Sequence, residues 1–156
     1  MIVITDLTAA FISFVFCSAL CSCSAWAADF SQDLPGTWSI VAELVASSSE
    51  NPDDPYAPKP GMIKSDVWSI YNEETGPVLT GNSGSISGQY VDGGAVFDGS
   101  YPMGSGVFLN VHIECAAIDA VSMYGVNENV YWGTNTVTGE MIKLGIESWK
   151  FQAKKQ

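Results

Sequence analysis

The chain has 156 residues and a formal net charge of -11, because 17 acidic side chains face only six basic ones. So few cations cannot neutralise a phosphate backbone, and the acidity repels anionic lipid headgroups, so the composition argues against nucleic acid and membrane surfaces as partners. Hydrophobic residues make up 47% and aromatic residues 12% of the chain, which is typical of one globular domain and excludes wholesale disorder.

Residues 1–27 are typical of a secretory signal. An apolar run becomes small and polar toward its end and finishes with Ala25-Trp26-Ala27, the small-x-small pattern that signal peptidase accepts, so cleavage is predicted before Ala28. The opening segment departs from the usual pattern, because it carries Asp6 and no basic residue. The prediction is a mature domain of residues 28–156 that is secreted or periplasmic.

Two alternatives remain for this segment. Leu20-Cys21-Ser22-Cys23 loosely resembles the lipobox of bacterial lipoproteins, in which Cys23 would carry a lipid anchor. About twenty apolar residues are also enough for an uncleaved membrane anchor. Under cleavage before Ala28, Cys115 is the one cysteine of the mature domain, so no internal disulfide is predicted.

The mature region opens with a turn and a β-branched, aromatic run that predicts a first strand around residues 37–41. Residues 47–61 are dense in Pro, Ser and Asp and predict a long exposed loop. A second strand is predicted over residues 62–71.

Glycine-rich segments follow at short intervals, with predicted strands at residues 77–80, 84–91 and 94–101. Asp92-Gly93 lies between two of them and predicts a tight hairpin that pairs 85–91 with 95–101. Gly88 and Gly99, inside these strands, predict bends or bulges.

The clearest strand covers residues 106–115, where apolar residues alternate with polar ones. Because the alternation has a period of two, Cys115 is predicted on the buried face and His112 on the opposite one. Further strands are predicted at residues 117–124, 129–133 and 141–151, with Thr138-Gly139 as the turn before the last.

Eight or nine short strands without helical periodicity predict an all-β, antiparallel fold. An up-and-down barrel of about eight strands is favoured, because closure removes exposed edges; a β-sandwich is the alternative.

Gly36-Thr37-Trp38 resembles the Gly-x-Trp that opens lipocalins and the Gly-Thr-Trp that opens avidins. The resemblance implies a calycin-like barrel in which Trp38 plugs one end. The apolar residues that follow do not match the avidin pattern of ligand-binding side chains, so no ligand residue is carried over.

No catalytic constellation stands out. His112 is the only histidine of the sequence. A Ser/His/Asp triad would need this residue as its base, and a zinc site would need further histidine or cysteine ligands at short spacing. The glycine-rich segments lack the lysine of a phosphate-binding loop, and the acids of 50–54 do not follow the spacing of a calcium loop. No metal or cofactor is predicted, and an enzyme is disfavoured.

The functional prediction is an exported, lipocalin-like barrel that binds a small, partly apolar or aromatic ligand. The candidate ligand contacts are the aromatic side chains of Trp38, Trp68, Tyr90 and Trp132, with the 47–61 loop as a lid. The first alternative is a cell-surface structural or adhesion module with a filled core. The second is an enzyme that uses paired carboxylates such as Asp92 and Asp98.

Overall fold

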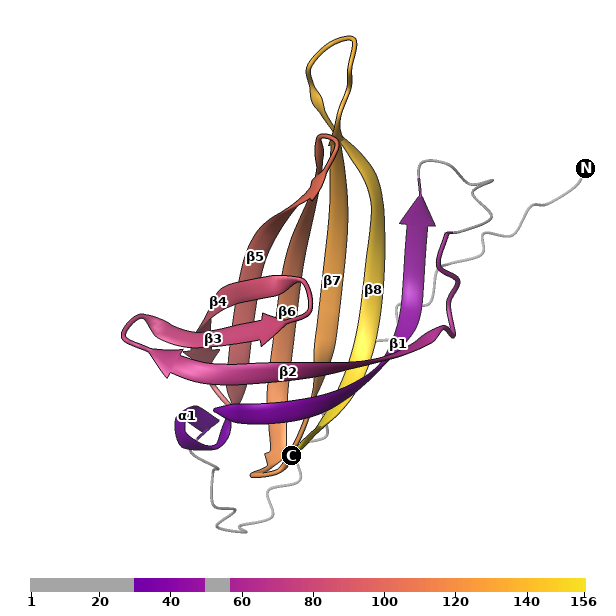
Figure 1. Cartoon of the computed structure of the whole chain (residues 1–156). Helices are drawn as coiled ribbons and strands as arrows, with labels where there is room; N and C mark the ends of the chain where they lie inside the picture. The colour runs from indigo at the N-terminus through magenta and orange to yellow at the C-terminus, as the bar shows by residue number, and fades with distance from the viewer. Residues whose placement is uncertain (1–29, 50–56) are drawn as a thin grey trace, which may run out of the picture.

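The chain folds into a closed, antiparallel barrel of eight strands in sequential order (Figure 1). The computed structural model describes residues 30–49 and 57–156. A short helix, α1 (Phe30–Asp33), precedes the strands, which are β1 (Gly36–Ser49), β2 (Ile63–Glu73), β3 (Gly76–Gly81), β4 (Gly84–Val91), β5 (Gly94–Gly104), β6 (Val107–Asp119), β7 (Ser122–Thr134) and β8 (Met141–Lys155). The predicted all-β, up-and-down barrel is confirmed.

Closure comes from β1, which pairs with both β2 and β8. Residues 36–43 lie against β2, whereas the ladder with β8 runs from Trp38 to Ser49. The register shifts between Leu44 and Ala46, and Figure 1 shows β1 bending upward along β8. This bend lets one strand serve both ends of the sheet.

Most strand predictions are confirmed, and one is wrong. The Asp92-Gly93 hairpin joins β4 and β5, with Val91 paired to Gly94. The predicted strand at 117–124 does not exist as one element, because β6 continues to Asp119 and β7 begins at Ser122. The predicted strand at 129–133 is part of β7, and β1 extends to Ser49, inside the predicted loop. A long run of alternating residues does not show where the pairing between two strands ends, so the strand boundaries could not be predicted from it.

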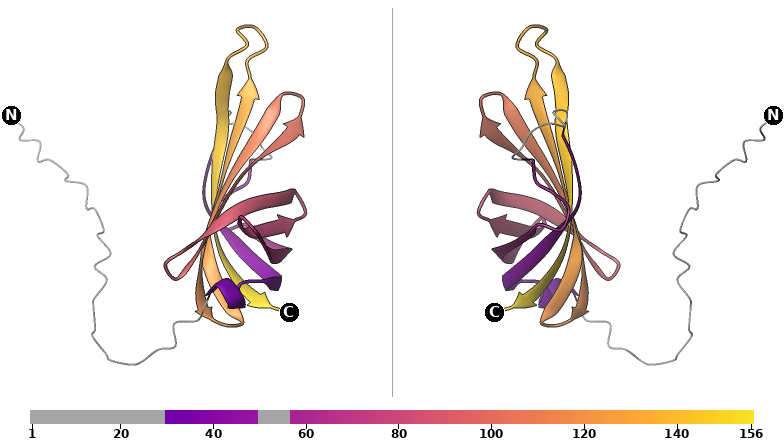
Figure 2. Two further views of the ribbon diagram at one scale, coloured as in Figure 1. Left: turned by 90° about the vertical axis from the view of Figure 1, so that its left-hand side faces the viewer. Right: turned by 90° about the vertical axis from the view of Figure 1, so that its right-hand side faces the viewer.

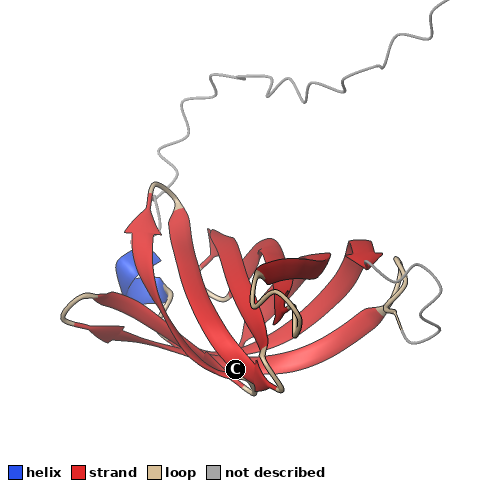
Figure 3. Ribbon diagram, turned by 90° about the horizontal axis from the view of Figure 1, so that it is seen from above, coloured by secondary structure: helices blue, strands red, loops and turns tan. Residues whose placement is uncertain are grey.

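Alternation along most of the strands separates a buried interior from an exposed exterior. On β1, Trp38, Ile40, Ala42 and Leu44 are buried while the residues between them are exposed or half-exposed. The same period puts Ile113 and Cys115 of β6 in the core. Figure 3 shows the strands curling about this interior.

One end of the barrel is plugged by α1 and the residues after it. Phe30 and Leu34 are buried in the core, and the indole N–H of Trp38 donates a 2.8 Å hydrogen bond to the carbonyl of Leu34. The ammonium of Lys155 donates to the carbonyl of Asp33 at 2.7 Å. These contacts fasten the plug to the first and last strands. Figure 2 shows α1 at the same end of the barrel as the C-terminus.

Interior glycines make room for large side chains. The sequence predicts bends or bulges at Gly88 and Gly99. The ladders run through both residues without a register shift, so neither residue forms a bulge. A Cβ at Gly88 would meet the ring of Phe97, and one at Gly99 would meet the side chain of Ile86. Both glycines therefore serve packing.

Three sequence-based predictions lie outside the described residues: the secretory signal at 1–27, the lipid anchor at Cys23, and the part of the predicted lid at 50–56. Over 30–49 and 57–156, no helix has the length and apolarity that crossing a bilayer would need.

Gly125→Ala is expected to destabilise the barrel. Its new Cβ would collide with the backbone carbonyl of Glu114 and with the ring of Phe151, and overpacking of this kind costs about 1–3 kcal/mol. The thermal unfolding midpoint should fall by several degrees, roughly 3–10 °C. Gly139→Asn is the control, because nothing lies within 4 Å of that exposed turn and asparagine tolerates its φ of 75°. Equal midpoints for the two variants would contradict this account.

Candidate functional site

Polar side chains occupy the interior away from the α1 plug. Lys64 and Asp66 of β2, Asn127 and Asn129 of β7, and Glu147 of β8 all lie on the inward-facing rows of their strands. Both asparagines are buried, at 8% and 7% exposure. Burial of polar groups costs free energy unless they are paired, so this half of the interior is where a site is to be sought.

A cavity of about 110 Å³ lies among these side chains. Its apolar wall comes from β1, β3, β4, β6 and β8, including Ile40, Leu79, Ile86, Ile113 and Phe151. Asn82 and Ser83 of the β3–β4 turn are exposed and also line it, so the cavity opens at this turn. In Figure 1 the short β3–β4 hairpin stops below the upper ends of β5 to β8.

Asp66 accepts hydrogen bonds from two parts of the cavity wall near its opening. Its Oδ1 accepts a 2.8 Å hydrogen bond from the Asn82 side-chain amide, and its Oδ2 accepts one of 3.1 Å from the Trp68 indole. The Trp68 ring packs edge-on against Phe151, with centroids 4.9 Å apart. Both carboxylate oxygens of Asp66 are therefore used in holding the turn and the aromatic wall.

Lys64 lies in the polar half of the interior, beside the cavity. Its ammonium is 3.8 Å from the centroid of the Trp149 ring, and the Trp149 indole donates a 3.0 Å hydrogen bond to Glu147. Burial lowers the pKa of Lys64, and the negative charges of Glu147 and Asp66 partly oppose that change. The cation is held by the ring face and by charge attraction across the interior.

Asn127 is the one buried polar residue of the cavity wall whose acceptor is unpaired in the described structure. Asn127 belongs to β7 and is paired with Ile113 of β6 on one side and with Trp149 of β8 on the other. It lines the cavity, and its Oδ1 has no hydrogen-bond partner among the described residues. Asn129, two residues along, donates to Glu147 at 3.5 Å.

The four predicted ligand contacts do not form one cluster. Trp68 lines the cavity. Trp38 is 1% exposed and belongs to the plug, and the Tyr90 hydroxyl donates to the carbonyl of Ser31 beside it. Trp132 lies opposite Phe108 of β6, which is exposed, whereas its neighbour Tyr131 faces the interior. Trp132 therefore lies on the outer wall of the barrel.

Sequence reasoning missed the polar residues of the cavity. The available signal was spacing: Lys64, Asp66 and Trp68 are two residues apart and share a face, as do Asn127 and Asn129. Which face is interior is decided by the ladders on either side.

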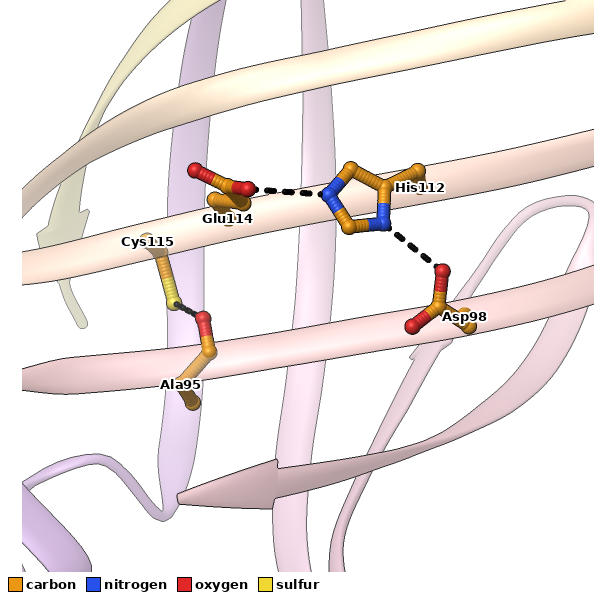
Figure 4. Close-up of polar contacts among 5 residues, drawn as sticks. All are labelled: Ala95, Asp98, His112, Glu114 and Cys115. Atoms are coloured by element: carbon orange, nitrogen blue, oxygen red, sulfur yellow. Dashed lines mark hydrogen bonds and ion pairs between the residues drawn. The ribbon is translucent and has the colours of Figure 1, made fainter. Parts of the chain in front are cut away.

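The outer wall carries the histidine (Figure 4). His112 Nδ1 lies 2.7 Å from Asp98 and its Nε2 lies 3.0 Å from Glu114, and these hydrogen bonds raise its pKa. Cys115 points the other way, donates to the carbonyl of Ala95 at 3.5 Å, and has its pKa raised to about 12 by burial. The predicted separation of His112 from Cys115 is confirmed, and the thiol is unsuited to nucleophilic attack.

A larger hollow of about 930 Å³ lies on the outside of β1, β8, β7 and β6. Its exposed apolar residues include Val41, Tyr124 and Val126. The carboxylates proposed for catalysis are dispersed, because Asp92 is at the rim of this hollow while Asp98 pairs with His112. Among the residues described, no group of three or more acidic, histidine or cysteine side chains gathers as metal ligands would.

No protein-family model matches the chain, and no curated protein matches it at a significant level. Among solved structures, the chain resembles EF1p2_mFAP2b bound to DFHBI, with 15% sequence identity and a TM-score of 0.43. The match covers 80% of this chain and 95% of that chain. At this level it carries no inference about a ligand.

The pKa of His112 should lie above 6.5 in an NMR titration, and Asp98→Asn should lower it toward that value. Because the folded-state pKa exceeds that of an unfolded histidine, the stabilisation is fully present below about pH 6.5 and is lost as pH rises through the folded-state pKa. The thermal midpoint of the native chain should therefore fall across this window relative to His112→Gln. Parallel pH profiles for the two proteins would show that the ion pairs do not form.

Proposed function

We propose that this chain is an exported, lipocalin-like barrel that binds a small, partly apolar ligand in its interior. The observation that carries the proposal is the cavity that opens at Asn82-Ser83. Its walls combine apolar side chains with a few polar ones, among them Asp66 and Asn129, a combination typical of small-molecule sites.

The volume sets the size of the ligand. A cavity of about 110 Å³ is smaller than an engineered cavity of roughly 150 Å³ that holds benzene. Because this one opens at a turn, a single ring can enter with one edge left at the mouth. A larger ligand would leave most of its surface outside.

The alternative of a surface module with a filled core is less well supported. It requires side chains to occupy the whole interior, whereas the polar half of this barrel contains a cavity of about 110 Å³. The outer hollow could serve such a module, but nothing in the described structure shows what would cover it.

Binding is tested with two one-ring probes, phenol and toluene, by following the indole N–H resonance of Trp68. At least one probe is expected to shift this resonance, with a dissociation constant on the order of 1 mM or below. Ala42→Leu should weaken binding about tenfold or more, because Ala42 is 4% exposed and lines the cavity, so the larger side chain fills it. Val45→Leu, on the same strand at an exposed position, is the matched control. No shift with either probe in the native chain would refute the proposal.

Export is tested separately, by expressing the full chain in a bacterium with a functional secretion pathway. Mass spectrometry of the exported protein should give a mature form that begins at Ala28, and Ala27→Leu should block this cleavage, because signal peptidase requires a small residue there. A mature form that begins at acylated Cys23 would favour the lipoprotein alternative, and an intact cytoplasmic chain would refute export.

A further inference from the structure

The cavity combines aromatic side chains with a carboxylate. Trp68, Tyr101 and Phe151 line it, and so does Asp66. The face of an aromatic ring attracts a cation, and the attraction is stronger where water is excluded. Rings and a carboxylate around one small space therefore favour an apolar ligand that carries positive charge.

No ion pair compensates the charge of Asp66. Its hydrogen-bond donors are neutral groups: the Asn82 side-chain amide, the Trp68 indole and the backbone N–H of Val67. Over the described part of the chain, the close ion pairs are those of His112 on the outer wall. Neutral donors stabilise a carboxylate but leave its net charge in place, so Asp66 gives the cavity a negative potential.

The ammonium of Lys64 is directed away from Asp66. Among the described residues, Lys64 is the one cation that lines the cavity. Its Nζ lies 3.8 Å from the centroid of the Trp149 ring, and Glu147 attracts it more strongly than Asp66 does. Lys64 thus shows that this interior holds a cation between an indole face and a carboxylate, and it leaves the charge of Asp66 largely unopposed. The net charge of -11 on the whole chain acts in the same direction.

The hydrogen bonds of Asp66 also determine which kind of cation fits. Its Oδ1 already accepts from Asn82 and Val67, and its Oδ2 accepts from Trp68. A primary ammonium carries three N–H groups that each need an acceptor once they leave water, and unpaired ones cost free energy. A charged nitrogen bonded only to carbon carries no N–H, and the apolar surface around it can contact the rings.

We propose that the cavity selects a small organic cation whose charged nitrogen carries no N–H, of the size and class of N-methylpyridinium, and that the Asp66 carboxylate supplies the charge that selects it. The inference rests on the proposed function, since it names the ligand class of the same cavity. The aromatic side chains contact the body of the ligand, and Asp66 is the residue that determines specificity.

The experiment compares N-methylpyridinium with toluene, which has the same shape and no charge, and with benzoate, which is an anion. Dissociation constants come from the Trp68 indole N–H resonance of each protein. In the native chain N-methylpyridinium should bind about tenfold more tightly than toluene, because the carboxylate and the ring faces attract only the cation. Benzoate should bind more weakly than toluene, because Asp66 repels it.

Asp66→Asn removes the charge and keeps the shape of the side chain. It should weaken N-methylpyridinium binding about tenfold and leave toluene binding within about twofold of its native value. Glu43→Gln is the matched control, because Glu43 is exposed on the outer wall of β1 and does not line the cavity. It changes the net charge of the chain equally and should retain the native preference.

Lys64→Met gives a second test should Asp66→Asn fail to fold. Lys64 is half-buried, and methionine replaces it with an uncharged side chain of similar length. Loss of the competing positive charge should strengthen N-methylpyridinium binding about threefold or more and leave toluene binding within about twofold. Lys150→Met, at an exposed position of β8, is the control and should leave both constants unchanged.

The outcomes separate the two proposals. If toluene binds the native chain and N-methylpyridinium binds no more tightly, the cation class is wrong and the binding function stands. If Asp66→Asn and Glu43→Gln weaken N-methylpyridinium binding equally, the overall charge of the chain causes the preference and the role of Asp66 is overturned. If neither N-methylpyridinium nor any neutral probe binds, the proposed function fails together with this inference.

Discussion

The β1–β8 ladder is the constraint on which the rest of the structure depends. It joins the first and last strands from Trp38 to Ser49 and so converts a sheet of local hairpins into a ring. Closure leaves no long unpaired edge, and it forces every second side chain of each strand into one enclosed volume. Large residues such as Phe97 and Phe151 fit there only because Gly88 and Gly125 give up their side-chain space.

The enclosed volume is divided along its length. Near α1 it is a packed apolar core, in which Phe30, Leu34 and Trp38 are almost fully excluded from solvent. Toward the other end, Lys64, Asp66 and Asn127 replace apolar side chains on the same inward rows. A barrel that only needed stability would have continued its apolar filling, since polar groups inside it must each find a partner.

Most of those polar groups have partners that also fix the geometry of the opening. Asp66 holds the β3–β4 turn through Asn82 and the aromatic wall through Trp68, while Trp149 is held by Glu147. Asn127 Oδ1 is the exception in the cavity wall.

The sequence by itself determined the all-β class, the Asp92-Gly93 hairpin, and the opposite orientations of His112 and Cys115. These features follow from period-two alternation and turn chemistry, which act between residues close in the chain. Tertiary structure decided where the ladders end around 119–122, and that Trp132 lies outside while Asn127 lies inside. The strand ends and these orientations depend on which strands pair and on the closure of the barrel. Pairing between residues far apart in the chain cannot be recognised from a short stretch of sequence.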